Sequence, residues 1–327
     1  MFVIIKTNGR SRGRGMMTRT ATSWEDVREC YSSEEACAEA LFAARWPKGF
    51  CCPACGHSYY YVTRTRRLPL YECKSCRHQA SPTAGTVMEG SSTPLSKWFQ
   101  AIFLLSQPGG ISSVRLAEAL EVTYKTAWLI SHKIRQAMRE AQQAEVLEGA
   151  VRIEAFGYGT SLLLQPNQPL LMGGSFDEEG ELRHLKLQQP DPDHVKLWNR
   201  MIHKDGYEAF EAECVGQAAV TRGLYYSTSH RQLHPFRRQL NEWLRDTFCG
   251  IGAKHLQAYL HEFSFRVNGE RAVRAADSLF FSLLGWCSSA SRLTYAVLTR
   301  PRRTLPVAWQ AYGTKGKWSS VRRRIYI

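Results

Sequence analysis

Two pairs of cysteines have the residue type and spacing that a zinc ion requires. Cys52 and Cys55 form one Cys-x-x-Cys motif, and Cys73 and Cys76 form a second after 17 intervening residues. A gap of about 15–20 residues is typical of four-cysteine zinc ribbons, in which each motif makes a tight turn and presents two thiolates to one ion. The intervening segment is aromatic and β-branched, which suits a β-hairpin. We therefore expect a structural Zn²⁺ at these four cysteines.

The other six cysteines do not form a second metal-binding pattern. Cys51 adjoins a predicted ligand, and His57 and His78 follow the two motifs, so each is an alternative ligand; we expect all three to be bystanders. The isolated cysteines are expected to be small core residues: Cys30, Cys37, Cys214, Cys249 and Cys287. The absence of a recognisable secretory signal indicates a reducing compartment, where paired cysteines bind metal more often than they form disulfides.

The net charge of +14 is concentrated towards the two ends of the chain. Residues 1–20 carry five Lys or Arg and residues 299–327 carry eight, with no acid in either segment, which leaves +1 for residues 21–298. Basic tails suit a phosphate backbone or another polyanion; the alternative is that they are simply solvated. A hydrophobic content of 44% over 327 residues excludes wholesale disorder, and no run approaches the ~18 apolar residues of a membrane span.

The residues after the ribbon predict a helix-turn-helix. A helix is expected over 95–106, then a short helix over 113–120, a turn at 121–123 and a longer helix from Tyr124. Apolar side chains recur at helical spacing on one face of each of the last two helices. The outward face and its flanks are expected to carry groups that suit phosphates and base edges: Lys125, Thr126, His132, Lys133, Arg135 and Gln136. The alternative is an ordinary helical hairpin with a solvated basic face.

The second half of the chain combines strand and helix patterns. Strands are predicted over 151–156, 169–176, 181–187 and 217–221, and helices over 193–203, 235–247, 253–266 and 272–287. Strands followed by packed helices suit a mixed sheet flanked by helices. With the ribbon and the helical region, the prediction is an α+β multidomain protein. A β-rich binding domain is the alternative for this half.

Several stretches of the sequence resemble one known family. The likeness is carried by CCPACGH, YECKSCRHQASPTAGTVMEGSSTPLSKWFQAIFLLS and GISSVRLAEALEVTYKTAWLISHKIRQAM. They are similar to the N-terminal half of bacterial insertion-sequence transposases with a zinc ribbon, relatives of the eukaryotic Merlin elements. KHLQAYLHEFSFRVN at 254–268 resembles a helix near the end of that family's catalytic domain, so the likeness spans about residues 30–285.

The resemblance implies an organisation and a set of partners. It implies a ribbon and a helix-turn-helix that bind terminal repeats in double-stranded DNA, a homo-oligomer on that DNA, and a ribonuclease-H-like domain with an Asp–Asp–Glu or Asp–Asp–Asn triad. We expect a bacterial, cytoplasmic protein associated with the nucleoid and not with a membrane. The expected divisions are a disordered basic tail (1–29), a helix (30–48), the ribbon (49–82), the helical DNA-binding region (94–142), the ribonuclease-H-like domain (148–287) and a basic tail (288–327).

The catalytic positions that the resemblance carries over are degraded. Strand transfer of this type uses two divalent ions, Mg²⁺ or Mn²⁺, held by converging carboxylates. Glu154 takes the place of the first catalytic Asp and Arg222 that of the second, while the third falls within 234–242, where Gln239 is the nearest match. Because a cation repels a metal ion, we expect Arg222 to pair with Glu154 instead. The alternatives are that Glu154 survives as a metal ligand and that Arg222 clamps a phosphate.

Together these features predict a DNA-binding protein of the transposase family whose strand-transfer site is impaired. An active transposase whose acids have moved to other positions is the second hypothesis. A zinc-ribbon transcription regulator with an unrelated C-terminal half is the third, and the match at 254–268 argues against it. Structural zinc is expected in each case, whereas Mg²⁺ or Mn²⁺ is expected only if the catalytic site survives.

Overall fold

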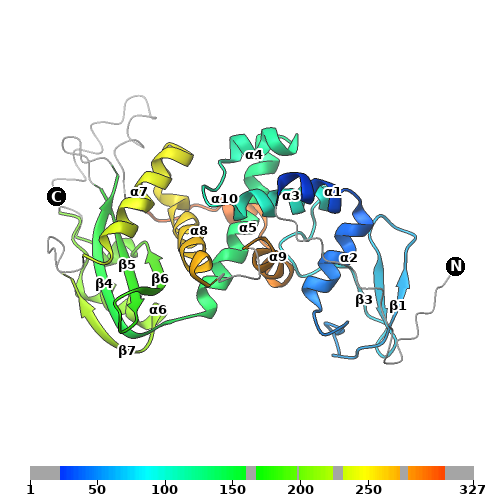
Figure 1. Cartoon of the computed structure of the whole chain (residues 1–327), viewed down its shortest axis with the longest axis horizontal. Coiled ribbons are helices and arrows are strands. Elements are labelled where there is room, and N and C mark those ends of the chain that lie inside the picture. Colours follow the sequence, from blue (N-terminus) through cyan, green and yellow to red (C-terminus); the bar gives the residue numbers. More distant parts are fainter. Residues whose placement is uncertain (1–22, 160–166, 197–198, 224–230, 273–278, 306–327) are drawn as a thin grey trace. The chain divides into compact units, whose positions relative to one another are not determined.

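The computed structural model describes residues 23–159, 167–196, 199–223, 231–272 and 279–305 (Figure 1). Its contacts divide the chain into two compact units. Unit 1 contains the residues up to Ala137 together with Ala275–Tyr295, and unit 2 contains Met138–Arg274 with the residues from Ala296 onward. Of the expected basic tails, 1–29 and 288–327, residues 1–22 and 306–327 lie outside the described residues. The expectation of a disordered first tail is wrong for residues 24–29, which belong to a helix. The described part of the second tail is packed in places, since Leu305 is buried and Arg303 donates two hydrogen bonds of 2.6 Å to Asp193. Within the described ranges, no helix is long and apolar enough to cross a membrane.

Unit 1 begins with two short helices and a three-stranded antiparallel sheet. Helices α1 (Trp24–Cys30) and α2 (Glu34–Arg45) replace the expected single helix at 30–48, because Ser33 caps a new helix. Strands β1 (Tyr60–Thr63), β2 (Leu70–Cys73) and β3 (Gln79–Ala80) lie in that order beside α2 (Figure 1). An aromatic core joins this sheet to the end of α2: Phe42, Trp46, Phe50, Tyr60 and Tyr71.

The rest of unit 1 is helical. Most residues of helix α3 (Leu95–Ser106) are buried. The ring centroid of its Phe99 lies 6.5 Å from that of Phe280 in α9 (Leu279–Ser289). Helix α4 (Ser113–Leu120) buries Leu116 and Leu120 and ends at Glu121, whose left-handed backbone (φ 52°) reverses the chain. After Val122 and Thr123, helix α5 (Tyr124–Ala144) begins and continues into unit 2. The predicted limits of α3 and α4 and the start of α5 coincide with the observed ones.

Unit 2 is built on a four-stranded mixed sheet. Its strands are β4 (Leu147–Tyr158), β5 (Gln168–Phe176), β6 (Leu182–Gln188) and β7 (Val215–Arg222), in the order β6-β5-β4-β7. Neighbours among β4, β5 and β6 are antiparallel, whereas β7 is parallel to β4. A parallel neighbour requires a crossover, which contains a 3-10 helix, η1 (Pro192–His194), and helix α6 (Lys204–Cys214).

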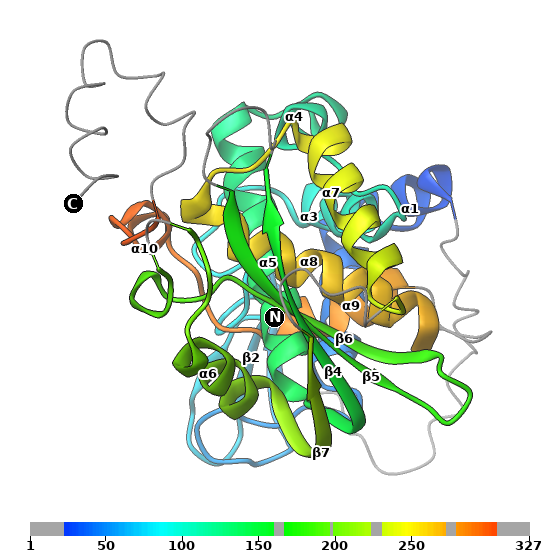
Figure 2. The same ribbon diagram turned by 90° about the vertical axis from the view of Figure 1, so that its left-hand side faces the viewer.

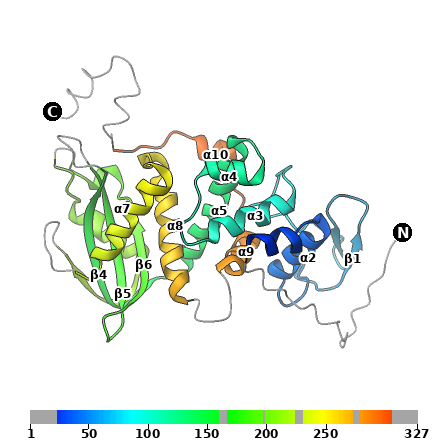
Figure 3. The same cartoon turned by 45° about the horizontal axis from the view of Figure 1, so that its top comes forward.

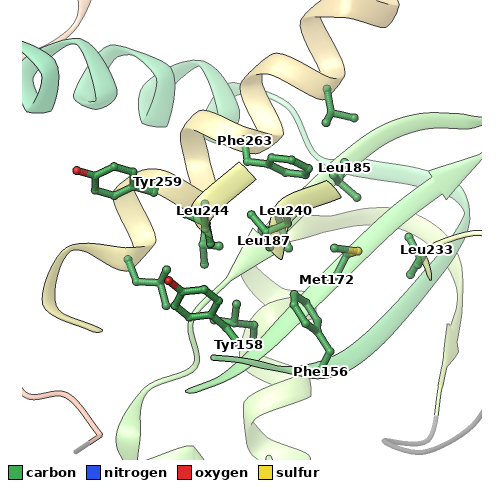
Figure 4. Packing of buried hydrophobic residues seen from close by; sticks show 14 of the residues in the cluster. Phe156, Tyr158, Met172, Leu185, Leu187, Leu233, Leu240, Leu244, Tyr259 and Phe263 are labelled. Carbon is green, nitrogen blue, oxygen red and sulfur yellow. The ribbon is translucent and has the colours of Figure 1, made fainter. Parts of the chain in front are cut away.

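Helices flank both faces of this sheet. Helices α7 (His234–Phe248) and α8 (Ala253–Ala272) lie along one side of β4, β5 and β6 (Figure 3), and α6 lies beside β7 (Figure 2). The core under α7 and α8 includes Phe156, Tyr158, Met172, Leu240 and Phe263 (Figure 4). The core under α6 uses the alternate residues of the same strands, including Ile153 and Ala155, together with Phe210 of α6. The α+β fold class with a mixed, helix-flanked sheet is therefore confirmed.

Helix α8 covers the outer edge of β6. The Asn268 amide accepts from the N–H of Leu185 at 2.8 Å and donates to its carbonyl at 3.0 Å. The Gln257 amide accepts from the N–H of Gln189 at 2.6 Å and donates to the carbonyl of Leu187 at 3.0 Å. Side-chain amides thus take the place of a neighbouring strand, so this edge is not available for pairing.

Some sequence expectations for unit 2 differ from the structure. The helix expected over 193–203 is replaced by η1 and an isolated bridge between Val195 and Ile202. Helix α6 follows it and was not predicted. Cys249 is exposed because it ends α7 in a left-handed conformation, and Cys30 is half-buried; neither is a core residue. The other isolated cysteines are buried as expected: Cys37, Cys214 and Cys287.

Candidate zinc site and nucleic-acid-binding residues

The four predicted cysteines converge on one point. Their Sγ atoms all lie within 4.8 Å of one another, with Cys52 3.6 Å from Cys76 and Cys55 3.6 Å from Cys73. A tetrahedral zinc with Zn–S bonds of about 2.3 Å separates its sulfurs by about 3.8 Å. The observed spacing therefore fits a structural Zn²⁺ held by four thiolates.

Two equivalent backbone turns present the thiols. In the first, the N–H of Gly56 donates to the carbonyl of Cys52 at 2.9 Å, and Gly56 has φ 75°. In the second, the N–H of Arg77 donates to the carbonyl of Cys73 at 3.1 Å, and Arg77 has φ 61°. A positive φ is unusual for arginine, so the turn geometry is imposed at this position by the requirements of the knuckle.

The residues next to the ligands take other roles. His57 and His78 accept, through their backbone carbonyls, from the N–H groups of the first cysteine of each motif. The thiol of Cys51 points to the carbonyl of Gly56 at 3.7 Å. Neither histidine nor Cys51 has a ligand atom in the cluster, which contains four cysteines alone.

Electrostatics favours a cation in the cluster. Burial raises the pKa of Cys73, but the N–H groups of Cys76 and Ser75 and the neighbouring thiols outweigh it and lower that pKa to about 7. Cys55 receives a hydrogen bond from His57 that lowers its pKa, yet the adjoining thiols raise it to about 12. Thiolates that lie this close together repel one another. A divalent ion with a preference for thiolates removes that repulsion.

Only the start of α5 exposes the residues expected to contact DNA. Lys125 is exposed, with its Nζ 4.8 Å above the ring of Tyr295. Thr126 is half-buried and shares a hydrogen bond of 2.9 Å with Thr123, whose Oγ1 also accepts from the N–H of Thr126. Tyr124 is 56% exposed. The first turn of this helix therefore faces solvent.

Further along α5, the structure contradicts the expected outward orientation. His132, Lys133 and Arg135 are all buried, and Gln136 is half-buried with a 3.2 Å bond to Ser291. The Lys133 ammonium donates to the carbonyl of Glu89 at 3.2 Å. Burial lowers the pKa of Lys133, and nearby Arg292 adds to this while Glu89 opposes it.

These side chains of α5 are buried because neighbouring residues pack around the helix. Lys133 also lies over the ring of Trp98 in α3, and Arg135 bonds to Ser131 at 3.0 Å. The ring of His132 packs against Trp128, with centroids 4.4 Å apart and an interplanar angle of 57°. Long side chains with cationic ends can be covered along their stems in this way, which a helical pattern in sequence does not reveal.

Glu154 lies on the α7 face of the sheet, where it is paired. It is buried on β4, and its carboxylate accepts from Arg237 of α7 at 3.3 Å. Burial raises the pKa of Glu154, while Arg237 and then His234 act to lower it. A carboxylate with this partner is a poor ligand for a divalent cation, because the guanidinium of Arg237 already balances its negative charge.

Arg222 lies on the opposite face, so the expected Glu154–Arg222 pair does not form. Arg222 is in register with Ile153, and side chains of consecutive strand residues alternate between faces. Its guanidinium instead makes two hydrogen bonds, of 2.6 and 2.8 Å, to Glu211 of α6. Two bonds to one carboxylate hold Arg222 in place, away from Glu154.

The third expected position also lacks an acid. Gln239 is exposed on α7, and Glu242 pairs with Arg238 at 2.9 Å. Among the described residues, the four cysteines form the one group of three or more side chains able to share a metal. The remaining segments contain a single acidic residue, Asp277.

Arg237 and Glu211 are the partners that the sequence did not reveal. The first pair joins positions 83 residues apart, and the second joins β7 to a helix that was not predicted. No spacing rule connects residues at such separations. An acid on a buried strand followed by a basic helix is the one available signal, and it does not identify which arginine makes the pair.

Two comparisons with known proteins bear on the chain. Residues 32–79 match the sequence model of a family described as the transposase zinc-ribbon domain. Over 128 residues, the chain is 32% identical to an "Uncharacterized protein in transposable element ISH50" from Halobacterium salinarum. That stretch covers 38% of this chain and 42% of the relative. No solved structure matches the chain.

The chain thus contains a zinc ribbon of the type found in transposases. It is similar to a protein of a transposable element, although the similarity spans less than half of either protein. Both findings support a protein related to transposases. The family match includes all four cysteines of the cluster. It begins twenty residues before Cys52 and ends three residues after Cys76, so it covers the ribbon together with α2.

Proposed function

We propose that this protein is a DNA-binding member of the transposase family that recognises the ends of an insertion element and has an inactive strand-transfer site. The observation that carries the proposal is the convergence of four thiols within 4.8 Å, inside the segment that matches the transposase zinc ribbon. Bound Zn²⁺ would supply the folding energy of the ribbon, and the cysteines would fix its shape for contact with DNA.

The second contact with DNA in this proposal is the pair α4 and α5. A short helix, a three-residue turn and a longer helix have the dimensions of a helix-turn-helix, whose second helix uses its N-terminal residues in the major groove. The exposed residues at that end are Tyr124 and Lys125, with Thr126 partly exposed. Lys133 and Arg135 have structural roles in this account because they are buried.

The sheet of unit 2 is the ribonuclease-H-like domain of the proposal, together with α6, α7 and α8. Its support is the mixed order β6-β5-β4-β7, which makes the two strands with the expected catalytic positions direct neighbours. Inactivity is supported by the side chains: Glu154 is paired with Arg237, and Arg222 faces the other side with Glu211. Among the described residues, Mg²⁺ or Mn²⁺ therefore finds no converging carboxylates at these positions. Assembly as a homo-oligomer on paired DNA ends also belongs to the proposal.

Selection from random DNA tests this function. The full zinc-loaded chain is mixed with a library of random double-stranded DNA, and bound molecules are amplified over several rounds. We expect enrichment of one sequence whose affinity falls linearly with the logarithm of the salt concentration. The enriched duplex, incubated with Mg²⁺ or Mn²⁺, should stay uncut. Absence of binding to any duplex at low salt would refute DNA recognition, and metal-dependent cutting would refute inactivity.

A further inference from the structure

The sheet of the zinc ribbon has two faces with different partners. The inner face packs Tyr60, Val62 and Tyr71 into the aromatic core with α2. Because strand residues alternate, the neighbouring residues point the other way. We call this side the outer face; it consists of Tyr59, Tyr61, Glu72, Lys74 and Gln79. The register supports the assignment, since Tyr61 is opposite Glu72, which is in turn opposite Gln79.

Two tyrosines of the outer face lie outside the aromatic core of the ribbon. Tyr59, which directly precedes β1, is 52% exposed, and Tyr61 within β1 is half-buried. Residues at this spacing lie about 7 Å apart along an extended chain. The ring of Tyr59 also lies 5.5 Å from the ring of His57, at an interplanar angle of 49°. Exposed rings gain little from folding, so their position suggests a ligand that stacks on them.

The charges around the rings suit an anionic partner. The Lys74 ammonium lies 4.8 Å over the ring of Tyr61, and the backbone N–H of Lys74 donates to the carbonyl of Tyr59 at 3.0 Å. Glu72 is the acid of this face, but its carboxylate accepts from Arg77 at 3.2 Å and from Gln79 at 2.9 Å. The charge of Arg77 therefore offsets that of the Glu72 carboxylate next to an approaching phosphate.

We propose that the outer face binds unpaired nucleotides of a DNA strand, with bases stacked on Tyr59 and Tyr61 and phosphates near Lys74. This proposal rests on the DNA-binding function proposed above. Bases of an intact duplex have both faces covered by their neighbours, so rings on a flat sheet can stack only on bases that are unpaired or at a strand end. The ribbon would then hold opened or single-stranded DNA, while α4 and α5 contact duplex DNA.

The test compares two DNA probes with the full zinc-loaded chain. The probes are a fluorescent single strand of mixed sequence and a blunt hairpin duplex of the same stem sequence, whose loop is replaced by a non-nucleotide linker. The variants are Tyr59→Leu with Tyr61→Leu, which removes the rings, and Tyr59→Phe with Tyr61→Phe, which keeps them. Tyr124→Leu is the matched control because it removes an exposed tyrosine at the start of α5. Zinc content confirms that each variant retains its ribbon.

The double leucine variant should bind the single strand about tenfold or more weakly than the wild type, while its affinity for the hairpin stays within about twofold. The double phenylalanine variant should bind both probes like the wild type, and Tyr124→Leu should leave single-strand binding unchanged. The proposal is overturned if the leucine variant retains single-strand affinity, if it loses both probes equally, or if phenylalanine fails to substitute. A wild type that binds the hairpin but not the single strand also overturns it and leaves the proposed function intact. Binding to neither probe removes both.

Discussion

The zinc ribbon and the sheet of unit 2 differ in how their metal-binding side chains are partnered. In the ribbon, four thiols lie within 4.8 Å of one another, and each is 3.6 Å from another thiol of the cluster. In the sheet, Glu154 is bonded to Arg237, and the expected second position is an arginine bonded to Glu211. Both regions place polar groups at the positions that their patterns indicate, yet only the first leaves them free to bind an ion.

This difference shows that a metal site depends on the absence of competing partners as much as on the ligands. A thiol cluster in two tight turns has its geometry set by a few local residues. A carboxylate site on a sheet depends on several distant elements, and one arginine brought in by a helix is sufficient to occupy a carboxylate. Loss of the second type of site is therefore easier than loss of the first.

The largest expected effect comes from removing a ligand of the ribbon. Cys52→Ser and Cys73→Ser should each reduce zinc from one equivalent per chain to nearly none and make the ribbon sensitive to protease, because zinc binding supplies its folding energy. Elemental analysis and limited proteolysis measure both effects. Cys51→Ser is the control and should keep one equivalent of zinc. Retention of zinc by both ligand variants would show that the thiol cluster is not the site.

Breaking the pairs on the two faces of the sheet should have unequal effects. Arg237→Ala leaves the buried carboxylate of Glu154 without its cation and should cost about 1–3 kcal/mol of unfolding free energy. Arg222→Ala removes a more exposed pair and should cost about 0–1 kcal/mol. Denaturant unfolding followed by tryptophan fluorescence gives both values. Equal costs would contradict the assignment of Glu154 as a buried, neutralised acid.

Two lysines of α5 should separate stability from DNA binding. Lys133→Met should lower the unfolding free energy by about 1 kcal/mol, because it removes a buried hydrogen bond to Glu89, and should leave the salt dependence of DNA binding unchanged. Lys125→Ala should leave stability unchanged and reduce the slope of affinity against salt by about 1. Thermal unfolding and salt titration of duplex binding make the comparison. The reverse pattern would place the DNA contact along the helix and not at its start.

The smallest effect is a pH dependence. Burial raises the folded pKa of Glu154 above its unfolded value, so the folded state holds this proton more tightly. Its contribution to stability is therefore complete below the unfolded pKa and is lost as the pH rises through the folded pKa. Glu154→Gln should remove that part of the decline, measured as the difference from the wild type in unfolding free energy between acidic and neutral pH. If the unfolding free energies of Glu154→Gln and the wild type differed by the same amount at acidic and neutral pH, the pKa of Glu154 would not be raised.

Local patterns in the sequence predicted most of the elements. The limits of α3 and α4 and the start of α5 were predicted because caps and turn residues define helix ends. The four zinc ligands were predicted because their geometry is fixed within two short turns. Helix α6 was missed because it lies in a crossover whose start was assigned to an earlier helix that the structure replaces with a 3-10 turn and a bridge.

Contacts between distant segments were not predictable in the same way. The pairing of Glu154 with Arg222 was wrong because the register of β4 and β7 puts them on opposite faces, and a shift of one residue in an alignment changes the face. The burial of Lys133 and Arg135 depends on neighbouring segments that cover an apparently polar side of the helix. Both errors arise where tertiary packing, and not the spacing of residues along the chain, determines which side chains are in contact.

Titration with Mn²⁺ tests the central proposal most directly, namely that the chain binds zinc in its ribbon and has no working site for catalytic divalent ions. The full chain with zinc in its ribbon is titrated while paramagnetic resonance measures free Mn²⁺. We expect the signal to rise in proportion to the Mn²⁺ added, as in buffer, because Glu154 is paired with Arg237 and the described residues offer no cluster of three acids. Saturable binding of one or two Mn²⁺ per chain that Glu154→Gln abolishes would contradict the account.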